Sequence, residues 1–201
     1  MRLPREFFAR DTHAAAKDLL GKLLVRQWRG KLLAARIGEV ESYVGENDRA
    51  CHAARGLTPR TKVMFGEAGH AYVYLIYGMY HCLNIVTERE GFPAAVLVRG
   101  GVACPPTQVR GRSEEGGSRS YLTPTPSPTL GEGNLDGPGK LTRALHITRA
   151  QNGEDLVTSS RLFVADDGVR ISPAGILTTP RIGVDYAGED AKLPWRYFIR
   201  L

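Results

Sequence analysis

The sequence is short of cysteine and of long apolar runs. Its three cysteines, Cys51, Cys82 and Cys104, are an odd number and include no C-x-x-C pair. They indicate neither a disulfide framework nor a thiolate zinc site, and they favour a reducing compartment. No stretch approaches the roughly 18 apolar residues that a membrane-spanning helix needs, and the N-terminal "MRLPREFFARD" lacks the apolar segment of a signal peptide. We therefore expect a soluble protein of the cytoplasm.

Acidic residues are too few to balance the basic ones, and the imbalance lies in one half of the chain. The net charge is +6. Residues 1–111 carry sixteen Lys and Arg against ten Asp and Glu, whereas residues 112–201 carry eleven of each. A basic half favours a polyanionic partner, most often nucleic acid, whose binding weakens as the salt concentration rises. A solvated basic surface without a partner explains the same charge equally well.

The chain is long enough for one substantial domain. Its 201 residues include 42% hydrophobic and 24% charged residues, the composition of an ordinary globular protein. We expect a single domain over residues 1–201. Within it, residues 112–139 are rich in Ser, Thr, Pro and Gly and poor in core residues, which predicts a long mobile loop.

Local patterns predict helices and strands on both sides of that loop. Asp11 and Thr12 are typical of a helix cap, good helix formers follow them, and Gly21 is placed to end the helix. A tight turn at Arg29-Gly30 should join the first two strands. The other predicted elements are strands in 22–28, 31–44, 161–167 and 195–201 and a short helix in 140–148.

Tyrosine is concentrated in "YVYLIYGMYHCLN", which holds four of the eight tyrosines within nine positions. The spacing of two between Tyr72 and Tyr74 fits one face of a strand, and strand-like residues follow Tyr80. We therefore expect a hairpin with Tyr77 and Gly78 at its bend. A helical spacing of three also fits Tyr74, Tyr77 and Tyr80, so a buried helix is the alternative. An exposed tyrosine at a hairpin tip would stack on a base or contact a protein partner.

A pair of glutamates precedes the tyrosines in "RIGEVESYV". Simple alternation places Ile37, Glu39, Glu41 and Tyr43 on one face of a strand. Two carboxylates on a solvated sheet face are the ordinary explanation. The functional explanation is that one carboxylate is desolvated, held by a positive charge and used as a general base near an aromatic pocket. Periodicity does not choose between the two.

The segments "GEVESYVGENDRACHA", "TPRTKVMF", "YVYLIYGMYHCLNIV", "AVLVRG" and "RIGVDYAGEDAKLPWRYFIR" closely resemble the alkyladenine (3-methyladenine) DNA glycosylase family. Their order and spacing match from about residue 8 to the end, and only residues 112–136 fall outside. The resemblance implies a single compact mixed α/β domain, in which helices flank a curved antiparallel β-sheet and a β-hairpin protrudes. It also implies a monofunctional hydrolase that flips alkylated or deaminated purines out of duplex DNA, releases the base with an activated water and so initiates base excision repair.

The resemblance assigns catalytic roles to three residues. Glu41 matches the general base, which can accept the proton of the water and stabilise an oxocarbenium-like sugar. Arg99 matches a residue that helps hold the attacking water, and the main-chain carbonyl of Ile182 matches the other ligand of that water. No lysine occupies a matched pocket position, so Schiff-base chemistry and strand cleavage are not expected.

Other matches concern the base and the DNA backbone. Tyr43 and Tyr74 match aromatic walls that stack on the flipped base, His52 matches a third wall, and Asn84 matches a residue that discourages guanine. Tyr77 matches the side chain that fills the space left by the extruded nucleotide. The phosphate-contacting loop is matched by Thr58, Arg60 and Thr61.

The expected partner is double-stranded DNA with a damaged purine, bound by a monomer without cofactor or metal, at the nucleoid if the source is bacterial. One competing hypothesis is a non-catalytic nucleic-acid-binding protein that uses the same hairpin and basic face. Another is a metal hydrolase built from Glu39, Glu41, His52 and His81, which the absence of an H-E-x-x-H or similar spacing disfavours.

Overall fold

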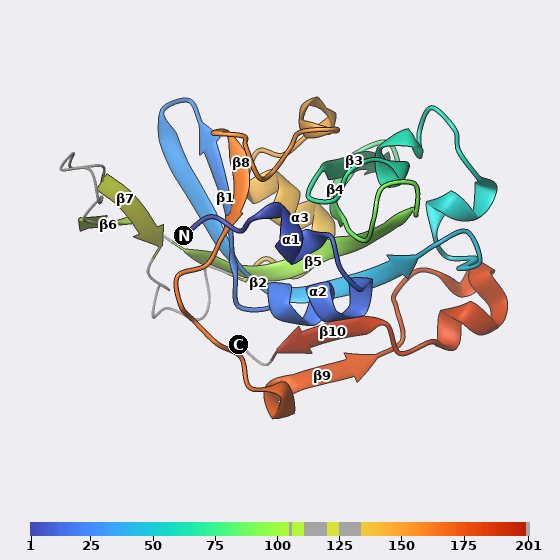
Figure 1. Cartoon of the computed structure of the whole chain (residues 1–201). Coiled ribbons are helices and arrows are strands. Elements are labelled where there is room, and N and C mark those ends of the chain that lie inside the picture. Colours follow the sequence, from blue (N-terminus) through green and yellow to red (C-terminus); the bar gives the residue numbers. More distant parts are fainter. Residues whose placement is uncertain (105, 111–119, 125–133, 200–201) are drawn as a thin grey trace.

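A strongly curved antiparallel sheet organises the molecule (Figure 1). The computed structural model describes residues 1–104, 106–110, 120–124 and 134–199. The strand order in the main sheet is β3-β4-β5-β2-β1-β8, and β10 pairs with both β2 and β9. The strands are β1 Leu23–Trp28, β2 Lys31–Val44, β3 Ala71–Ile76, β4 Tyr80–Val86, β5 Ala94–Cys104, β8 Leu162–Ala165, β9 Ile176–Thr179 and β10 Arg196–Ile199, with β6 Pro106–Arg110 and β7 Ser120–Pro124 in a separate hairpin.

The helices of the described residues are few and short. The α-helices are α1 Arg5–Phe8, α2 Thr12–Leu19 and α3 Pro138–Ala144, and 3-10 helices span His52–Arg55, Lys62–Phe65, Arg149–Gln151, Pro173–Gly175 and Asp185–Lys192. The main core joins residues of α1, α2 and α3 to residues of the sheet, such as Phe8, Leu19, Leu83 and Leu141. The prediction of a mixed α/β domain around a curved antiparallel sheet is confirmed.

The first helix and hairpin follow from local sequence chemistry. The Asp11 side chain accepts a hydrogen bond from the Ala14 amide at 2.8 Å and so caps α2 as expected. Arg29 and Gly30 both have positive φ, 47° and 76°, which is the geometry of the tight turns that match strand twist. The predicted helix and the two strands that follow it are confirmed.

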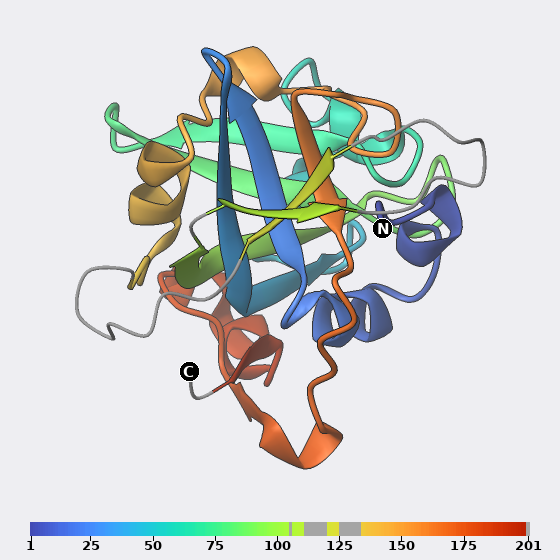
Figure 2. The ribbon, with the colours of Figure 1, turned by 90° about the vertical axis from the view of Figure 1, so that its left-hand side faces the viewer.

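The tyrosine-rich segment forms the expected hairpin of β3 and β4, so the helix alternative is wrong. Tyr77 and Gly78 lie at its bend with φ of 52° and 69°. The Met79 amide donates to the Ile76 carbonyl at 3.2 Å and closes the turn. In Figure 2 the hairpin tip and α3 lie together on the left side of the molecule, away from the N-terminus.

The long strand β2 creates the fork in the sheet that positions the site. One of its edges pairs with β5 along most of its length. Its other edge pairs with β1 over its first half, and with β10 from Glu39 to Glu41. The second half of β2 therefore lies between β5 and β10, where residues from distant parts of the chain meet it.

Simple alternation along β2 fails at one point, and the prediction that Ile37 shares a face with Glu41 is wrong. The pairing with β5 shifts on both sides of Glu39, because Gly38 of β2 and Arg99 of β5 each have no partner in this pairing, and these shifts mark β-bulges at both residues. Ile37 and Val40 both lie in the main core as a result. The partner strand makes room with glycine, because a Cβ on Gly101 would lie 1.9 Å from the Arg36 carbonyl oxygen.

Much of the predicted loop 112–139 lies outside the described residues. Of that stretch, residues 120–124 form β7, Asn134 bridges to Val102, and α3 begins at Pro138. The loop prediction therefore extended too far at its C-terminal end, because Pro138 is compatible with the first turn of a helix. No helix in the described part of the chain combines the length and the apolarity needed to cross a lipid bilayer.

Candidate active site

Glu41 is a fully buried carboxylate surrounded by hydrogen-bond donors. Its Oε1 accepts the Ile182 amide at 2.8 Å, and Arg99 Nη1 lies 3.3 Å from the same oxygen. Its Oε2 accepts the Tyr43 hydroxyl at 2.8 Å. The side chain has no exposed area. A buried carboxylate is tolerated only when such donors replace water, so the surroundings of Glu41 are built for a charged group.

Arg99 reaches Glu41 from the bulge where β5 faces β2. Its Nε donates to Glu39 at 2.9 Å, and Arg196 also binds Glu39. Burial lowers the pKa of Arg99, but Glu41 and Glu39 outweigh that effect and raise it. Glu39 therefore holds Arg99 beside Glu41.

An aromatic cavity of about 300 Å³ opens next to Tyr43. The rings of Tyr72 and Tyr74 lie 5.4 Å apart, and the His52 ring meets Tyr74 edge-on at 4.6 Å. Burial, followed by Glu41, raises the pKa of Tyr43. The residues that line the cavity include Tyr43, His52, Tyr72, Tyr74, Asn84, Gly183 and Val184. Flat aromatic surfaces with few polar edges suit a planar heteroaromatic ligand.

His52 is held as a neutral imidazole. Its Nδ1 lies 2.9 Å from the Tyr72 hydroxyl, and its Nε2 lies 3.3 Å from Arg60 Nη2. Because a guanidinium only donates, Nε2 accepts and the ring proton sits on Nδ1. Burial, followed by the charges of Arg60 and Arg55, lowers the pKa of His52 to about 4.

Of the three loop residues expected to contact phosphate, two are accessible to solvent. Arg60 is exposed and Thr58 is half-buried. Thr61 is buried, and its hydroxyl donates to the Gly56 carbonyl at 2.9 Å. Thr61 holds the loop from inside, so its expected contact with a phosphate does not fit its position.

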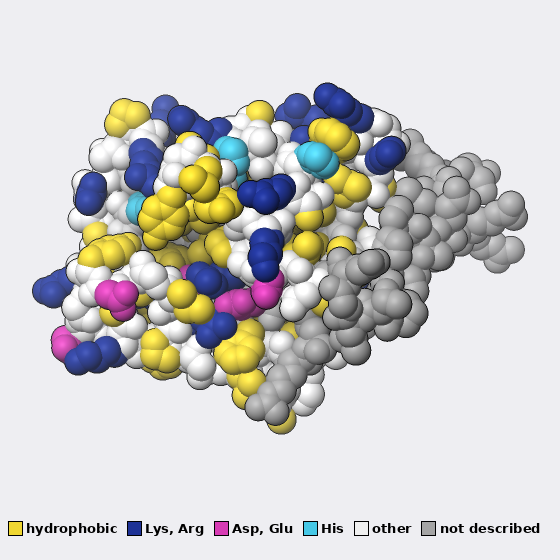
Figure 3. Space-filling view, turned by 180° about the vertical axis from the view of Figure 1, so that it is seen from behind, with side chains coloured by type: hydrophobic (Ala, Val, Ile, Leu, Met, Phe, Trp, Pro, Cys, Tyr) yellow, Lys and Arg dark blue, Asp and Glu magenta, His cyan; other side chains and the backbone are white. Residues whose placement is uncertain are grey.

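The hairpin tip exposes large apolar side chains to solvent. Tyr77 is 81% exposed and Met79 is 64% exposed. This face of the molecule is shown in Figure 3, where hydrophobic side chains gather on the left and Lys and Arg are scattered around them. Tyr77 also lines the aromatic cavity, so the tip and the cavity form one continuous surface.

The sequence matches the family model described as methylpurine-DNA glycosylase (MPG) over residues 6–201. The chain belongs to the methylpurine-DNA glycosylase family. Similar proteins carry the name "Putative 3-methyladenine DNA glycosylase", among them the following three. The protein of Methanocella arvoryzae is 51% identical, with 98% of this chain and 91% of the relative covered. Those of Myxococcus xanthus and Alkaliphilus oremlandii are each 46% identical, with 98% and 100% of this chain and 90% and 96% of the relatives covered.

Membership of the methylpurine-DNA glycosylase family confirms the expected resemblance and the expected enzyme class, a DNA N-glycosylase. The structure brings the three predicted catalytic residues together, but Ile182 contacts Glu41 through its amide. The predicted base-binding residues Tyr43, His52, Tyr74 and Asn84 all line one cavity. The roles of these residues remain predictions.

Sequence reasoning missed the support beneath Tyr43. Arg181 lies 4.9 Å below the Tyr43 ring and 4.9 Å from Trp195. Its two terminal nitrogens bind Asp48 at 2.6 and 2.8 Å, and neither side chain of the pair is exposed. Arg181 directly precedes the predicted site residue Ile182, and this position could have indicated that the arginine belongs to the site. No local pattern pointed to Asp48, which lies 133 residues earlier.

Three of the four residues of the metal-site hypothesis have other side-chain contacts. Glu39 and Glu41 bind arginines, and His52 binds Tyr72 and Arg60. In the part of the chain that the structure describes, no three His, Cys, Asp or Glu side chains gather closely enough to hold a metal ion.

Proposed function

We propose that this chain is a monofunctional glycosylase that flips alkylated or deaminated purines out of duplex DNA and hydrolyses their N-glycosidic bond. The observation that carries the proposal is the hydrogen bond between Tyr43 and Glu41, because it joins an aromatic cavity to a buried carboxylate. A base stacked on Tyr43 would bring its sugar toward Glu41.

Glu41 has the acceptor capacity for the chemistry. A carboxylate offers about four lone-pair sites; the hydrogen bonds from Ile182 and Tyr43 fill one on Oε1 and one on Oε2, and Arg99 forms an ion pair with Oε1. Oε2 can therefore accept one further hydrogen bond, from a water. As the bond from C1′ to the purine breaks, its electron pair leaves with the base, the water oxygen bonds to C1′, and Glu41 takes the water proton.

The remaining residues select and hold the substrate. Tyr77 would fill the gap in the duplex, and the energy of unstacking, a few kcal/mol, would be offset by contacts of the flipped base with the cavity. Asn84 is buried, and its amide donates to the Tyr72 carbonyl at 3.3 Å, which fixes its orientation in the wall. There it would crowd the exocyclic amine of guanine.

The test is direct. The purified chain is incubated in EDTA with a duplex that carries a single hypoxanthine or a methylated purine, and the released base is measured by chromatography. We expect free base and an intact strand until alkali is added. Borohydride should trap no covalent complex, since none of the described residues that line the cavity is a lysine. Tight binding of the damaged duplex without base release would favour the non-catalytic binder instead.

A further inference from the structure

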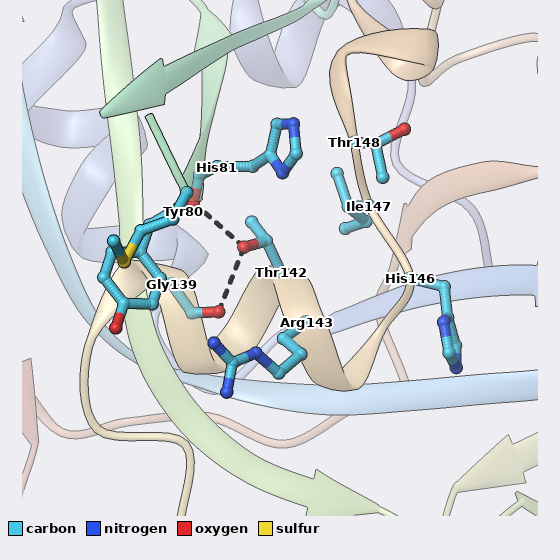
Figure 4. A pocket seen from close by; sticks show the side chains of 9 residues that line it. Tyr80, His81, Gly139, Thr142, Arg143, His146, Ile147 and Thr148 are labelled. Atoms are coloured by element: carbon cyan, nitrogen blue, oxygen red, sulfur yellow. Dashed lines mark hydrogen bonds between the residues drawn. The ribbon is translucent and has the colours of Figure 1, made fainter. Parts of the chain in front are cut away.

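A second cavity, of about 200 Å³, lies on the other side of the hairpin (Figure 4). It opens between the start of β4 and α3. Figure 4 shows Tyr80 on one side and His146 on the other, with Arg143 between them. The aromatic cavity borders the β3 side of the hairpin through Tyr77, and this cavity borders the β4 side through Met79 and Tyr80. The hairpin tip therefore separates two hollows.

The second cavity is lined by basic and imidazole side chains. Arg143, His81 and His146 all line it, and none of the described residues in its lining is Asp or Glu. The guanidinium of Arg143 lies over the Tyr80 ring at 5.6 Å. Among the described residues, no carboxylate pairs with Arg143, His81 or His146. Such a surface attracts an anion.

The surface is held in place from below. The Thr142 hydroxyl donates to the His81 carbonyl at 2.9 Å and ties α3 to β4. A Cβ on Gly139 would lie 2.9 Å from the Tyr80 ring, so only glycine lets α3 approach this closely. His146 stacks on Trp28 with ring centroids 3.6 Å apart and planes 5° apart. The cavity is thus a built feature of the fold.

We propose that this cavity binds the sugar-phosphate backbone of the undamaged strand. The inference rests on the proposed function. If Tyr77 enters a groove of the duplex, the two strands form the two rims of that groove, one on each side of the hairpin. The damaged strand supplies the nucleotide that enters the aromatic cavity. The undamaged strand then passes over the β4 side, where Arg143 meets a phosphate.

The experiment compares wild type with Arg143→Gln, and with Arg170→Gln as a matched control. Arg170 is also exposed but pairs with Asp166 away from both cavities. Binding is measured to an undamaged duplex, a damaged duplex and the damaged strand alone. Arg143→Gln should bind both duplexes more weakly and bind the single strand as wild type does. Loss of one phosphate contact lowers the slope of log affinity against log salt concentration by about 0.9. The affinity difference between wild type and Arg143→Gln should therefore shrink about threefold between about 50 and about 200 mM salt.

Neutral methylphosphonate linkages identify the strand. Placed in the undamaged strand opposite the lesion, these linkages should weaken DNA binding by wild type and leave DNA binding by Arg143→Gln unchanged. Equal losses of Arg143→Gln on duplex and single strand would assign the cavity to the damaged strand and overturn the inference. The inference would also be overturned if Arg143→Gln bound both duplexes with the same affinity and the same salt dependence as wild type. The strand assignment is also measured on an undamaged duplex, so it does not depend on base release. A wild type that releases no base would refute the proposed function, and the binding data would still test the strand assignment.

Discussion

Replacing Glu41 by glutamine removes the proposed base while keeping the size of the side chain. The amide oxygen can still accept the Ile182 amide and remain beside Arg99, because both groups contact Oε1. The new NH₂ can donate to the Tyr43 oxygen, because a phenol also accepts. Arg99 keeps Glu39 as a partner. We therefore expect Glu41→Gln to fold, with a loss of about 1 to 3 kcal/mol from the weaker hydrogen bonds.

The effect on catalysis should be much larger than the effect on stability. A positioned general base contributes about 10²- to 10⁴-fold, which corresponds to about 3 to 5 kcal/mol of activation free energy. The amide of glutamine takes no proton, and its neutral oxygen stabilises a positive sugar less well. Glu41→Gln should therefore release hypoxanthine at least about 100-fold more slowly than wild type under saturating enzyme. Its affinity for the damaged duplex should be retained.

The assay is single-turnover release from an end-labelled duplex, read as alkali-labile strands, beside a urea-unfolding curve. Glu39→Gln is the matched control, because it removes a neighbouring carboxylate that also binds Arg99, whereas the hydrogen bonds from Tyr43 and Ile182 go to Glu41. Its rate should fall less than about tenfold, since Arg99 keeps its contact with Glu41. A folded Glu41→Gln that released base at more than about a tenth of the wild-type rate would refute the reasoning.

Four further outcomes follow from the geometry. Tyr77→Ala should bind the damaged duplex at least about fivefold more weakly, by loss of about 1 to 3 kcal/mol of stacking, measured by titration; unchanged excision at limiting enzyme would contradict the wedge. Arg181→Met should lose about 3 to 5 kcal/mol of urea stability by leaving Asp48 buried without a partner, and the double variant with Asp48→Leu should recover part of that loss. Because the pKa of His52 is about 4 when folded and 6.5 otherwise, the unfolded chain takes up the proton first. The melting temperature should thus fall between pH 6.5 and 4, and less so in His52→Gln. Asn84→Ser should excise undamaged guanine faster than wild type, and an unchanged rate would remove its selective role.

The sequence was most informative where structure depends on neighbouring residues. The Asp11 cap and the turn at Arg29-Gly30 are decided within a few positions, because capping and positive φ are local properties. The bend at Tyr77-Gly78 is of the same kind. The order of the tyrosine and glutamate motifs also identified the family, which the full-length match confirms.

Contacts between segments that are distant in the chain could not be predicted from the sequence. The bulge at Gly38 depends on the glycines of β5 opposite, so alternation alone misplaced Ile37. The buried position of Thr61 depends on how its loop folds back on Gly56. Neither feature has a periodic pattern that could predict it.

The sequence by itself determined the local elements, the family and the residue types of the site. Only the tertiary structure decided that the Ile182 amide, 141 residues from Glu41, binds that carboxylate, and that Asp48 and Arg181 support Tyr43. The physical reason is that β2 forks between β5 and β10, so the partners of Glu41 come from strands and loops whose meeting is set by sheet pairing. Such pairings are fixed by the packing of the whole sheet, and a local stretch of sequence carries no record of them.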